Sequence, residues 1–162
     1  MIAVIGCGNS NRCDDGVGPE VVRALRKRDF GAGIGRLRLV DAGTDGMAAM
    51  FAARGCATLI IVDACRSGAE AGAIFEVPGH ELAQSYAPSL TLHDFRWDHA
   101  LDAGRRIFRE AFPADVVVLL VEAATVDYGL GLSPAAAAAA AMVVRRIETL
   151  IAARLQSEAA GS

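Results

Sequence analysis

The sequence predicts an α/β fold, a three-layer sandwich with a mostly parallel, twisted sheet of about five strands and helices on both faces. Short runs of aliphatic and β-branched residues alternate along the chain with segments of helical periodicity, which is the pattern of a parallel sheet. Some of these runs contain almost no polar residue, as is typical of strands that are buried on both faces. Hydrophobic residues make up 53% of the 162 residues, which is enough apolar surface for one core.

The chain opens with a strand and a helix. Residues 1–6 (MIAVIG) have no polar side chain and fit a fully buried strand. Residues 16–30 follow as a helix, because apolar residues recur at every fourth position and charged residues occupy the other faces. Asp15 directly precedes this helix and is its expected N-cap.

The second and third predicted strands enclose a short helix. Residues 36–41 first alternate between polar and apolar side chains and then end at Asp41. Residues 45–54 form a short amphipathic helix, with Thr44 as its expected cap. Residues 57–64 (ATLIIVDA) are apolar on both faces and form the third strand.

The second half of the chain supplies two more strands. Residues 72–78 directly follow the third strand, so this fourth strand is a candidate antiparallel edge. A helix is expected over residues 91–108, with His93 in its first turn. A buried strand is expected over 115–123, and the last helix over 134–156.

No feature of the sequence divides the chain, so we expect one domain over residues 1–157 and a frayed tail over 158–162. The net charge of −3 and the isoelectric point near 5.6 argue against nucleic acid as a partner. No run has the length and apolar character of a membrane span, and no leader pattern is visible. We therefore expect a cytoplasmic protein without a membrane partner, acting as a monomer.

Acidic side chains follow the ends of several predicted strands, where ligands bind in open α/β sheets. They are Asp14 and Asp15 after the first strand, Asp41 after the second, Asp63 after the third and Glu122 after the last. Simpler interpretations exist: Asp15 as a helix cap, Asp41 as an Asx turn, and Glu122 as the exit of its strand into water. Asp63 is harder to explain in this way, because it ends the buried run LIIVD, where a carboxylate requires a partner or a metal.

His93 reaches the same edge of the sheet if the helix that it opens returns across the sheet. Two carboxylates and one imidazole are a typical three-ligand set for a borderline divalent metal, and they leave a coordination position open for a substrate. A histidine at such a position is otherwise most often a first-turn or core residue. The spacing therefore favours a metal site at this edge without selecting its two acids.

Two other classes of α/β protein fit the sequence less well. A response-regulator receiver needs a lysine after a late strand, whereas Lys27, inside the first helix, is the only lysine of the chain. A dinucleotide-binding loop needs G-x-G-x-x-G, but Asn11 stands in place of the third glycine. Asp14 and Asp15 would also repel a phosphate at the helix start. A metal-sensing or metal-carrying chaperone with the same ligands stays open.

Five short motifs occur in a fixed order along nearly the whole chain. They are Gly6-Cys7-Gly8-Asn9 with Asp14-Asp15-Gly16-Val17-Gly18, then Asp41 to Thr44, Asp63-Ala64, His93, and Gly131 to Pro134. In this order the chain resembles the hydrogenase maturation proteases, which process the large subunit of [NiFe] hydrogenases.

The resemblance implies an endopeptidase that removes a short C-terminal extension from the nickel-loaded precursor of the hydrogenase large subunit. It implies Asp15, Asp63 and His93 as metal ligands and catalytic residues, and Asp41 as a further acidic residue needed for activity. The nickel belongs to the precursor, so the isolated protein is expected to carry no metal of its own. The alternative is a nickel-dependent chaperone or sensor that binds the same precursor without cutting it.

Some positions depart from the family's pattern or leave a choice open. Cys7 and Cys13 stand where the family does not usually have cysteine, and either could act as a nucleophile, although neither has a base beside it in the sequence. Asp14 or Asp15 could be the metal ligand, and we interpret Asp14 as the residue that holds the loop or caps the helix. The residues after His93 are more charged than usual, which leaves the identity of the hydrogenase open.

Overall fold

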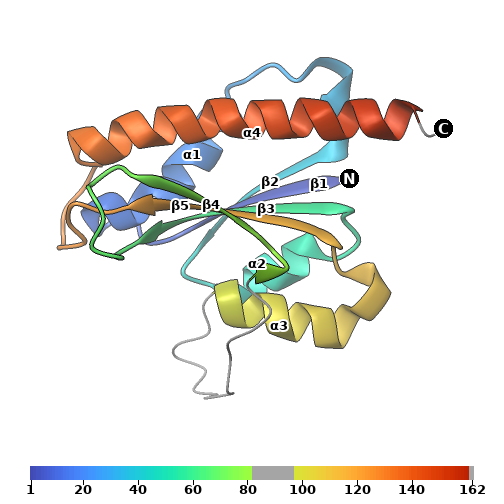
Figure 1. Ribbon diagram of the computed structural model, residues 1–162, viewed down its shortest axis with the longest axis horizontal. Coiled ribbons are helices and arrows are strands. Elements are labelled where there is room, and N and C mark those ends of the chain that lie inside the picture. The colour runs from blue at the N-terminus through green and yellow to red at the C-terminus, as the bar shows by residue number, and fades with distance from the viewer. Residues whose placement is uncertain (82–96, 161–162) are drawn as a thin grey trace.

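A five-stranded sheet runs through the middle of the protein, with helices on both of its faces (Figure 1). The computed structural model describes residues 1–81 and 97–160. The strands are β1 (Ile2–Cys7), β2 (Leu37–Gly43), β3 (Thr58–Cys65), β4 (Ile74–Pro78) and β5 (Asp115–Glu122). They lie in the order β2-β1-β3-β5-β4. The predicted three-layer α/β architecture is confirmed.

The sheet is parallel except at one edge. β1 lies between β2 and β3 and is parallel to both, and β3 is parallel to β5. β4 pairs antiparallel with β5, as predicted. The reason is the connection from β3 to β4, which is shorter than the dozen or so residues that a parallel crossover requires.

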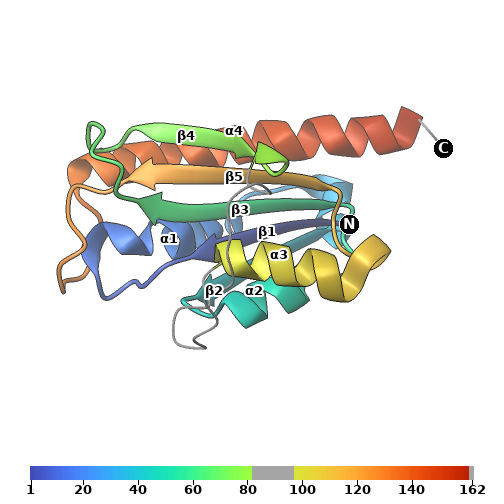
Figure 2. The same cartoon turned by 60° about the horizontal axis from the view of Figure 1, so that its bottom comes forward.

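The described α-helices pack in pairs on the two faces of the sheet (Figures 1 and 2). α1 (Val17–Leu25) and α4 (Pro134–Ala160) cover one face, and α2 (Gly46–Ala53) and α3 (Trp97–Phe108) cover the other. Each pair encloses its own hydrophobic cluster, and alternate residues of the strands contribute to each. Among these helices, none combines the length and apolar character needed to cross a membrane.

Two helix boundaries differ from the predictions. α1 ends at Leu25 rather than at Phe30, because its apolar stripe stops there and residues 26–30 form turns and irregular backbone. α4 continues to Ala160, past the predicted end at Gln156.

Two predicted caps are also wrong. Gly16, not Asp15, is the N-cap of α1, and no side chain caps this helix. The N-cap of α2 is Asp45 rather than Thr44, and its carboxylate accepts a hydrogen bond from the Ala48 N–H at 3.0 Å. Neither Asp15 nor Thr44 therefore caps a helix.

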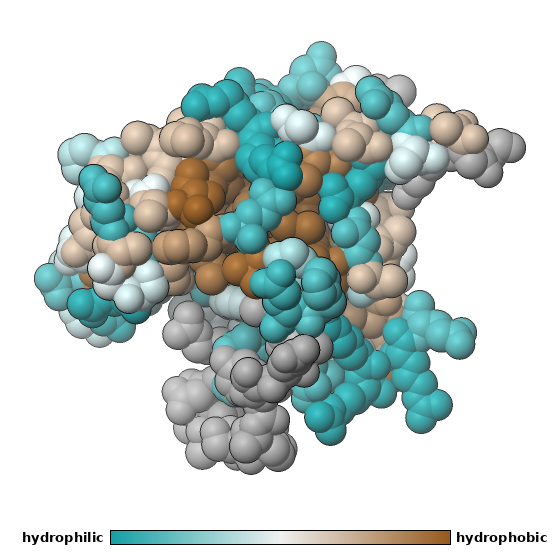
Figure 3. All heavy atoms as spheres, viewed as in Figure 1, coloured by the Kyte–Doolittle hydropathy of each residue, from teal (hydrophilic) through white to brown (hydrophobic). Residues whose placement is uncertain are grey.

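The edge strand β4 lies on the face shown in Figure 3, where hydrophobic side chains gather in the middle of the view. Glu76 of this strand accepts two hydrogen bonds from Arg146 of α4, both 2.8 Å long. This bidentate ion pair joins the helix to the exposed edge. A charged pair at a strand edge disfavours the addition of a further strand.

The start of α1 packs backbone to backbone against the central strands. A Cβ atom on Gly18 would lie 2.2 Å from the carbonyl oxygen of Cys7 and 2.5 Å from that of Val62. A Cβ atom on Gly6 would lie 2.2 Å from the carbonyl oxygen of Gly18. Only glycine fits at these two positions, and the contact holds the loop before α1 directly over the ends of β1 and β3.

This contact predicts a large effect of one methyl group. We expect Gly18→Ala to lower the free energy of unfolding by about 3 kcal/mol, because helix and strand backbones must move apart. Gly35→Ala is the matched control, since a Cβ atom there meets no atom within 4 Å, and its effect should stay within about 0.5 kcal/mol. Urea unfolding of both variants measures the difference, and equal stabilities would contradict the packing described for Gly18.

Candidate active site

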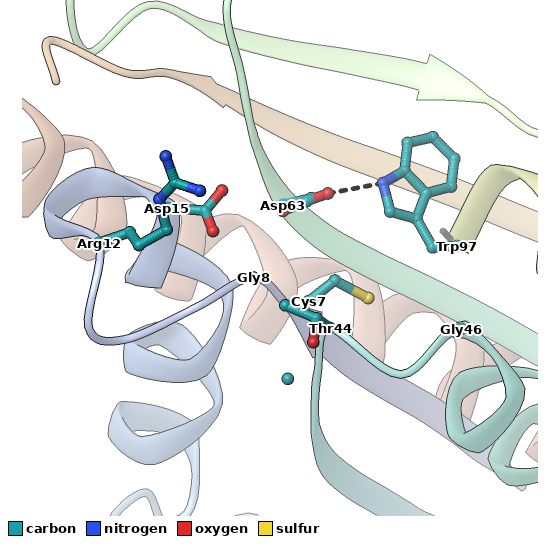
Figure 4. A pocket seen from close by; sticks show the side chains of 9 residues that line it. Cys7, Gly8, Arg12, Asp15, Thr44, Gly46, Asp63 and Trp97 are labelled. Carbon is teal, nitrogen blue, oxygen red and sulfur yellow. Dashed lines mark hydrogen bonds between the residues drawn. The ribbon is translucent and has the colours of Figure 1, made fainter. Parts of the chain in front are cut away.

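A cavity of about 360 Å³ opens at the carboxyl ends of the first three parallel strands (Figure 4). Its lining comes from β1 and the loop that follows it, from the β2–α2 connection, from β3 and from the start of α3. The lining residues are Cys7, Gly8, Arg12, Asp15, Gly43, Thr44, Gly46, Asp63 and Trp97. The structure therefore brings together Asp15 and Asp63, two of the residues predicted for the site.

Asp63 lies near the end of β3 and is only 4% exposed. Its Oδ2 accepts a hydrogen bond from the indole Nε1–H of Trp97 at 2.7 Å, and its Oδ1 accepts one from the Ala64 N–H at 2.8 Å. These donors satisfy the requirement for a partner that the buried run LIIVD imposes. The sequence predicts only that Trp97 lies in a helix over residues 91–108, although a buried indole N–H itself needs an acceptor.

Asp15 approaches the cavity from the loop between β1 and α1. It lies in a 3₁₀ turn (Cys13–Gly16), and its Oδ2 accepts a hydrogen bond from the Asn9 N–H at 2.9 Å. Gly8 passes between the two acids: a Cβ atom there would lie 1.8 Å from the Asp15 carbonyl oxygen and 3.4 Å from Oδ1 of Asp63. With its φ of +120°, this position requires glycine, and the loop is held tightly against both aspartates.

Asp14 has a different environment from its neighbour. It is 1% exposed, and its carboxylate accepts hydrogen bonds from the Ser133 N–H at 2.6 Å, the Ser133 hydroxyl at 2.9 Å and the Ala124 N–H at 2.8 Å. Burial alone would raise the pKa of Asp14, but these hydrogen bonds outweigh it and hold the pKa below its ordinary value. Asp14 therefore anchors the loop, as we predicted, and Asp15 is the aspartate at the cavity.

The other predicted acids lie elsewhere. Asp41 is exposed, accepts a hydrogen bond from the Gly43 N–H at 3.0 Å and does not line the cavity. Glu122 does not mark an exit into water: it is 3% exposed and accepts hydrogen bonds from the backbone and hydroxyl of Ser67 and from the Gly68 N–H. The bonds from Ser67 lower the pKa of Glu122 to about 2. Glu122 thus organises the loop after β3.

His93 lies outside the described residues. In the part of the chain that the structure describes, no group of three or more His, Cys, Asp and Glu side chains is arranged to hold a metal ion. The three-ligand set predicted from the sequence therefore depends on His93.

Three of the four cysteines lie near the candidate site or at the surface, in different environments. Cys7 lines the cavity, and its sulfur projects into it in Figure 4, whereas Cys13 lies at a separate surface depression beside Gly131. Burial, the hydrogen bond to Glu122 and the charges of Glu122 and Asp63 raise the pKa of Cys65 to about 12. Cys65 therefore remains a neutral thiol at pH 7, which excludes it as a thiolate nucleophile.

The family of the chain follows from a comparison with known protein families. The family model HycI, described as hydrogenase maturation protease, matches residues 19–150. The chain belongs to the hydrogenase maturation protease family. The matched range includes Asp63 and Trp97 and begins after the loop between β1 and α1, which contains Asp15. A comparison with curated proteins gave no match.

Solved structures of hydrogenase maturation proteases share this fold. The maturating endopeptidase HybD from Escherichia coli is 24% identical with a TM-score of 0.73, over 91% of this chain and 89% of that chain. The proteases HycI and HybD from Thermococcus kodakarensis are 17% and 19% identical, with TM-scores of 0.71 and 0.73. Both alignments cover 93% of this chain, and they cover 92% and 99% of the respective neighbours. At these identities the likeness establishes the fold.

The anchoring role of Asp14 predicts a pH-dependent stability. Its pKa is lower in the folded protein than its ordinary value of 3.8, so the ionised form stabilises the fold above about pH 4. This contribution is lost as the pH falls through the folded-state pKa. We expect Asp14→Asn to lower the free energy of unfolding by about 2–3 kcal/mol at pH 7, with a smaller difference from the wild type below pH 4.

Chemical denaturation between pH 3 and pH 8 measures this difference. Asp29→Asn is the control, because Asp29 is exposed and accepts a local hydrogen bond from the Gly31 N–H, and its effect should stay within about 0.5 kcal/mol. A difference between Asp14→Asn and the wild type that stays constant over this pH range would contradict the role of the ionised carboxylate.

Proposed function

We propose that this chain is an endopeptidase that removes the C-terminal extension from the nickel-loaded precursor of a [NiFe] hydrogenase large subunit. The observation that carries the proposal is the placement of Asp15 and Asp63, from two different elements, on the wall of one cavity in a chain of this family. The solved structures that share this fold include a [NiFe] hydrogenase maturation protease, which supports the same substrate class.

The two carboxylates suit a divalent cation brought by the substrate. Each carboxylate oxygen can accept more than one interaction, so the hydrogen bonds from Asn9 and Trp97 can persist while a metal binds. These donors orient the oxygens, as hydrogen bonds to metal ligands usually do. Two acids sharing a cavity also repel each other, which a divalent cation relieves. His93 is the proposed third ligand and supplies the preference for nickel over calcium or magnesium.

Recognition through the metal would position the scissile peptide. Binding of the precursor's nickel by the cavity fixes the peptide beside it, and such positioning is worth several kcal/mol of avoided entropy loss. Bound nickel can polarise a carbonyl or a water molecule. We propose Asp41 as the general base that takes a proton from the attacking water. Asp41 does not line the cavity itself, but it precedes Gly43 and Thr44, which do. This role requires a substrate that leaves the cavity over the end of β2.

A cleavage assay on nickel-loaded and nickel-free precursor tests the proposal. We expect the wild type to cut the nickel-loaded form at least about 100-fold faster. Asp15→Asn, Asp63→Asn and His93→Ala should each lose about 100-fold or more. Asp41→Asn should lower the rate of cutting without weakening binding of the loaded precursor, whereas the control Asp29→Asn should match the wild type.

Equal cleavage of both precursor forms would contradict recognition through the metal. If Asp15→Asn, Asp63→Asn and His93→Ala still cut, the site assignment is wrong. A wild type that binds the loaded precursor and never cuts it would identify a nickel-dependent chaperone instead.

A further inference from the structure

Arg12 is the cationic side chain among the described residues that line the cavity. Two contacts fix its guanidinium group. Its Nε–H donates a hydrogen bond to the carbonyl oxygen of Val126 at 3.0 Å, and the group lies over the ring of Tyr128, 5.3 Å from the ring centroid. Both partners come from the loop between β5 and α4, more than 100 residues away in the sequence.

The backbone holds the two loops together at the same point. Arg12 forms a β-bridge with Gly129, the Cys13 N–H donates to the Gly129 carbonyl at 2.9 Å, and the Gly129 N–H donates to the Asn11 carbonyl at 2.9 Å. The anchor at Asp14 follows directly. The backbone at Arg12 is therefore held in place, and the contacts with Val126 and Tyr128 restrict its exposed side chain before any substrate arrives.

A purely structural role would account for only part of this arrangement. The contact to Val126 uses Nε, and the contact to Tyr128 places the guanidinium carbon over the ring, so neither uses the Nη nitrogens as hydrogen-bond donors. In Figure 4 one of the terminal guanidinium nitrogens lies on the side of the Asp15 carboxylate, and Arg12 and Asp15 line the same cavity. Arg12 nevertheless forms no ion pair with an acid in the described part of the chain. Tyr128 is 85% exposed, so its cation–π contact with Arg12 lies at the surface.

The negative charges of the cavity suggest what the positive charge of Arg12 does there. Asp15 and Asp63 attract a metal cation, but they oppose any negative charge that develops on the substrate. Peptide hydrolysis develops such a charge: the water oxygen bonds to the carbonyl carbon, and the carbonyl π electron pair moves onto its oxygen. The C–N bond then breaks, and the departing nitrogen takes the proton that the water released. A fixed guanidinium can stabilise the intermediate oxyanion with charge-assisted hydrogen bonds.

We infer that Arg12 is a catalytic residue whose Nη groups bind the carbonyl oxygen of the scissile peptide and stabilise its oxyanion. This inference rests on the proposed peptidase function. It assigns to the opening loop both the acid that faces the metal, Asp15, and the cation that faces the reacting carbonyl.

Steady-state cleavage of the nickel-loaded precursor encoded by the same genome tests this role. We expect Arg12→Met to lower kcat about 100-fold or more with KM changed less than about 3-fold, because the lost interaction forms only in the transition state. Arg12→Lys keeps the charge and should fall between the wild type and Arg12→Met. Arg145→Met, on the exposed face of α4, is the control and should match the wild type.

The outcomes separate the possible roles. A wild-type kcat in Arg12→Met, or a raised KM with unchanged kcat, overturns the inference. Equal losses in Arg12→Met and Arg12→Lys, with lowered thermal unfolding midpoints in both, would mean that Arg12 only joins the two loops. If Arg12→Met does not fold, Arg12→Lys alone decides. A kcat of Arg12→Lys equal to that of the wild type overturns the inference. A reduced kcat of Arg12→Lys at an unchanged unfolding midpoint supports it. If the wild type itself cuts no precursor, the proposed function is contradicted. The wild-type assay alone shows this, without any Arg12 variant.

Discussion

The buried carboxylate of Asp14 is the interaction on which the geometry of the site depends. It accepts hydrogen bonds from Ser133 and Ala124, which lie more than 100 residues further along the chain. Through it, the loop after β1 is fixed to the connection between β5 and α4. The close contact of Gly18 with β1 and β3 fixes the same loop from the other side. Asp15 and Arg12, which the loop presents to the cavity, therefore have defined positions relative to Asp63 on β3.

The adjacent residues Asp14 and Asp15 thus have different roles: Asp14 anchors the loop, and Asp15 lines the cavity. The Asp14 side chain is saturated with backbone and hydroxyl donors, and it has no remaining access to a ligand. Asp15 keeps one backbone donor and faces the cavity. A glycine-rich loop at a helix start usually receives an anion. In the proposed function the acids reverse that preference: Asp15 faces a cation of the substrate, and Arg12 supplies positive charge to the same cavity.

Much of the fold could be predicted from the sequence because it depends on local patterns. The apolar runs marked β1, β3 and β5, and the short connection before β4 indicated the antiparallel edge. The partners of two acidic side chains were predicted wrongly. Asp15 had the sequence of a helix cap but bonds to Asn9, and Glu122 had the position of a strand exit but bonds to Ser67. The partnership of Asp63 with Trp97, and that of Arg12 with Tyr128, could not be predicted, since only tertiary packing brings these residues together.

We propose that Asp15 and Asp63, rather than Asp14, face the metal of the substrate. Anomalous diffraction at the nickel absorption edge, from crystals of the protein bound to its nickel-loaded precursor, tests this claim most directly. The account predicts one nickel peak in the cavity, within coordination distance of carboxylate oxygens of both Asp15 and Asp63, with Asp14 still bonded to Ser133. A nickel peak bound by Asp14, or one located away from this cavity, would contradict it.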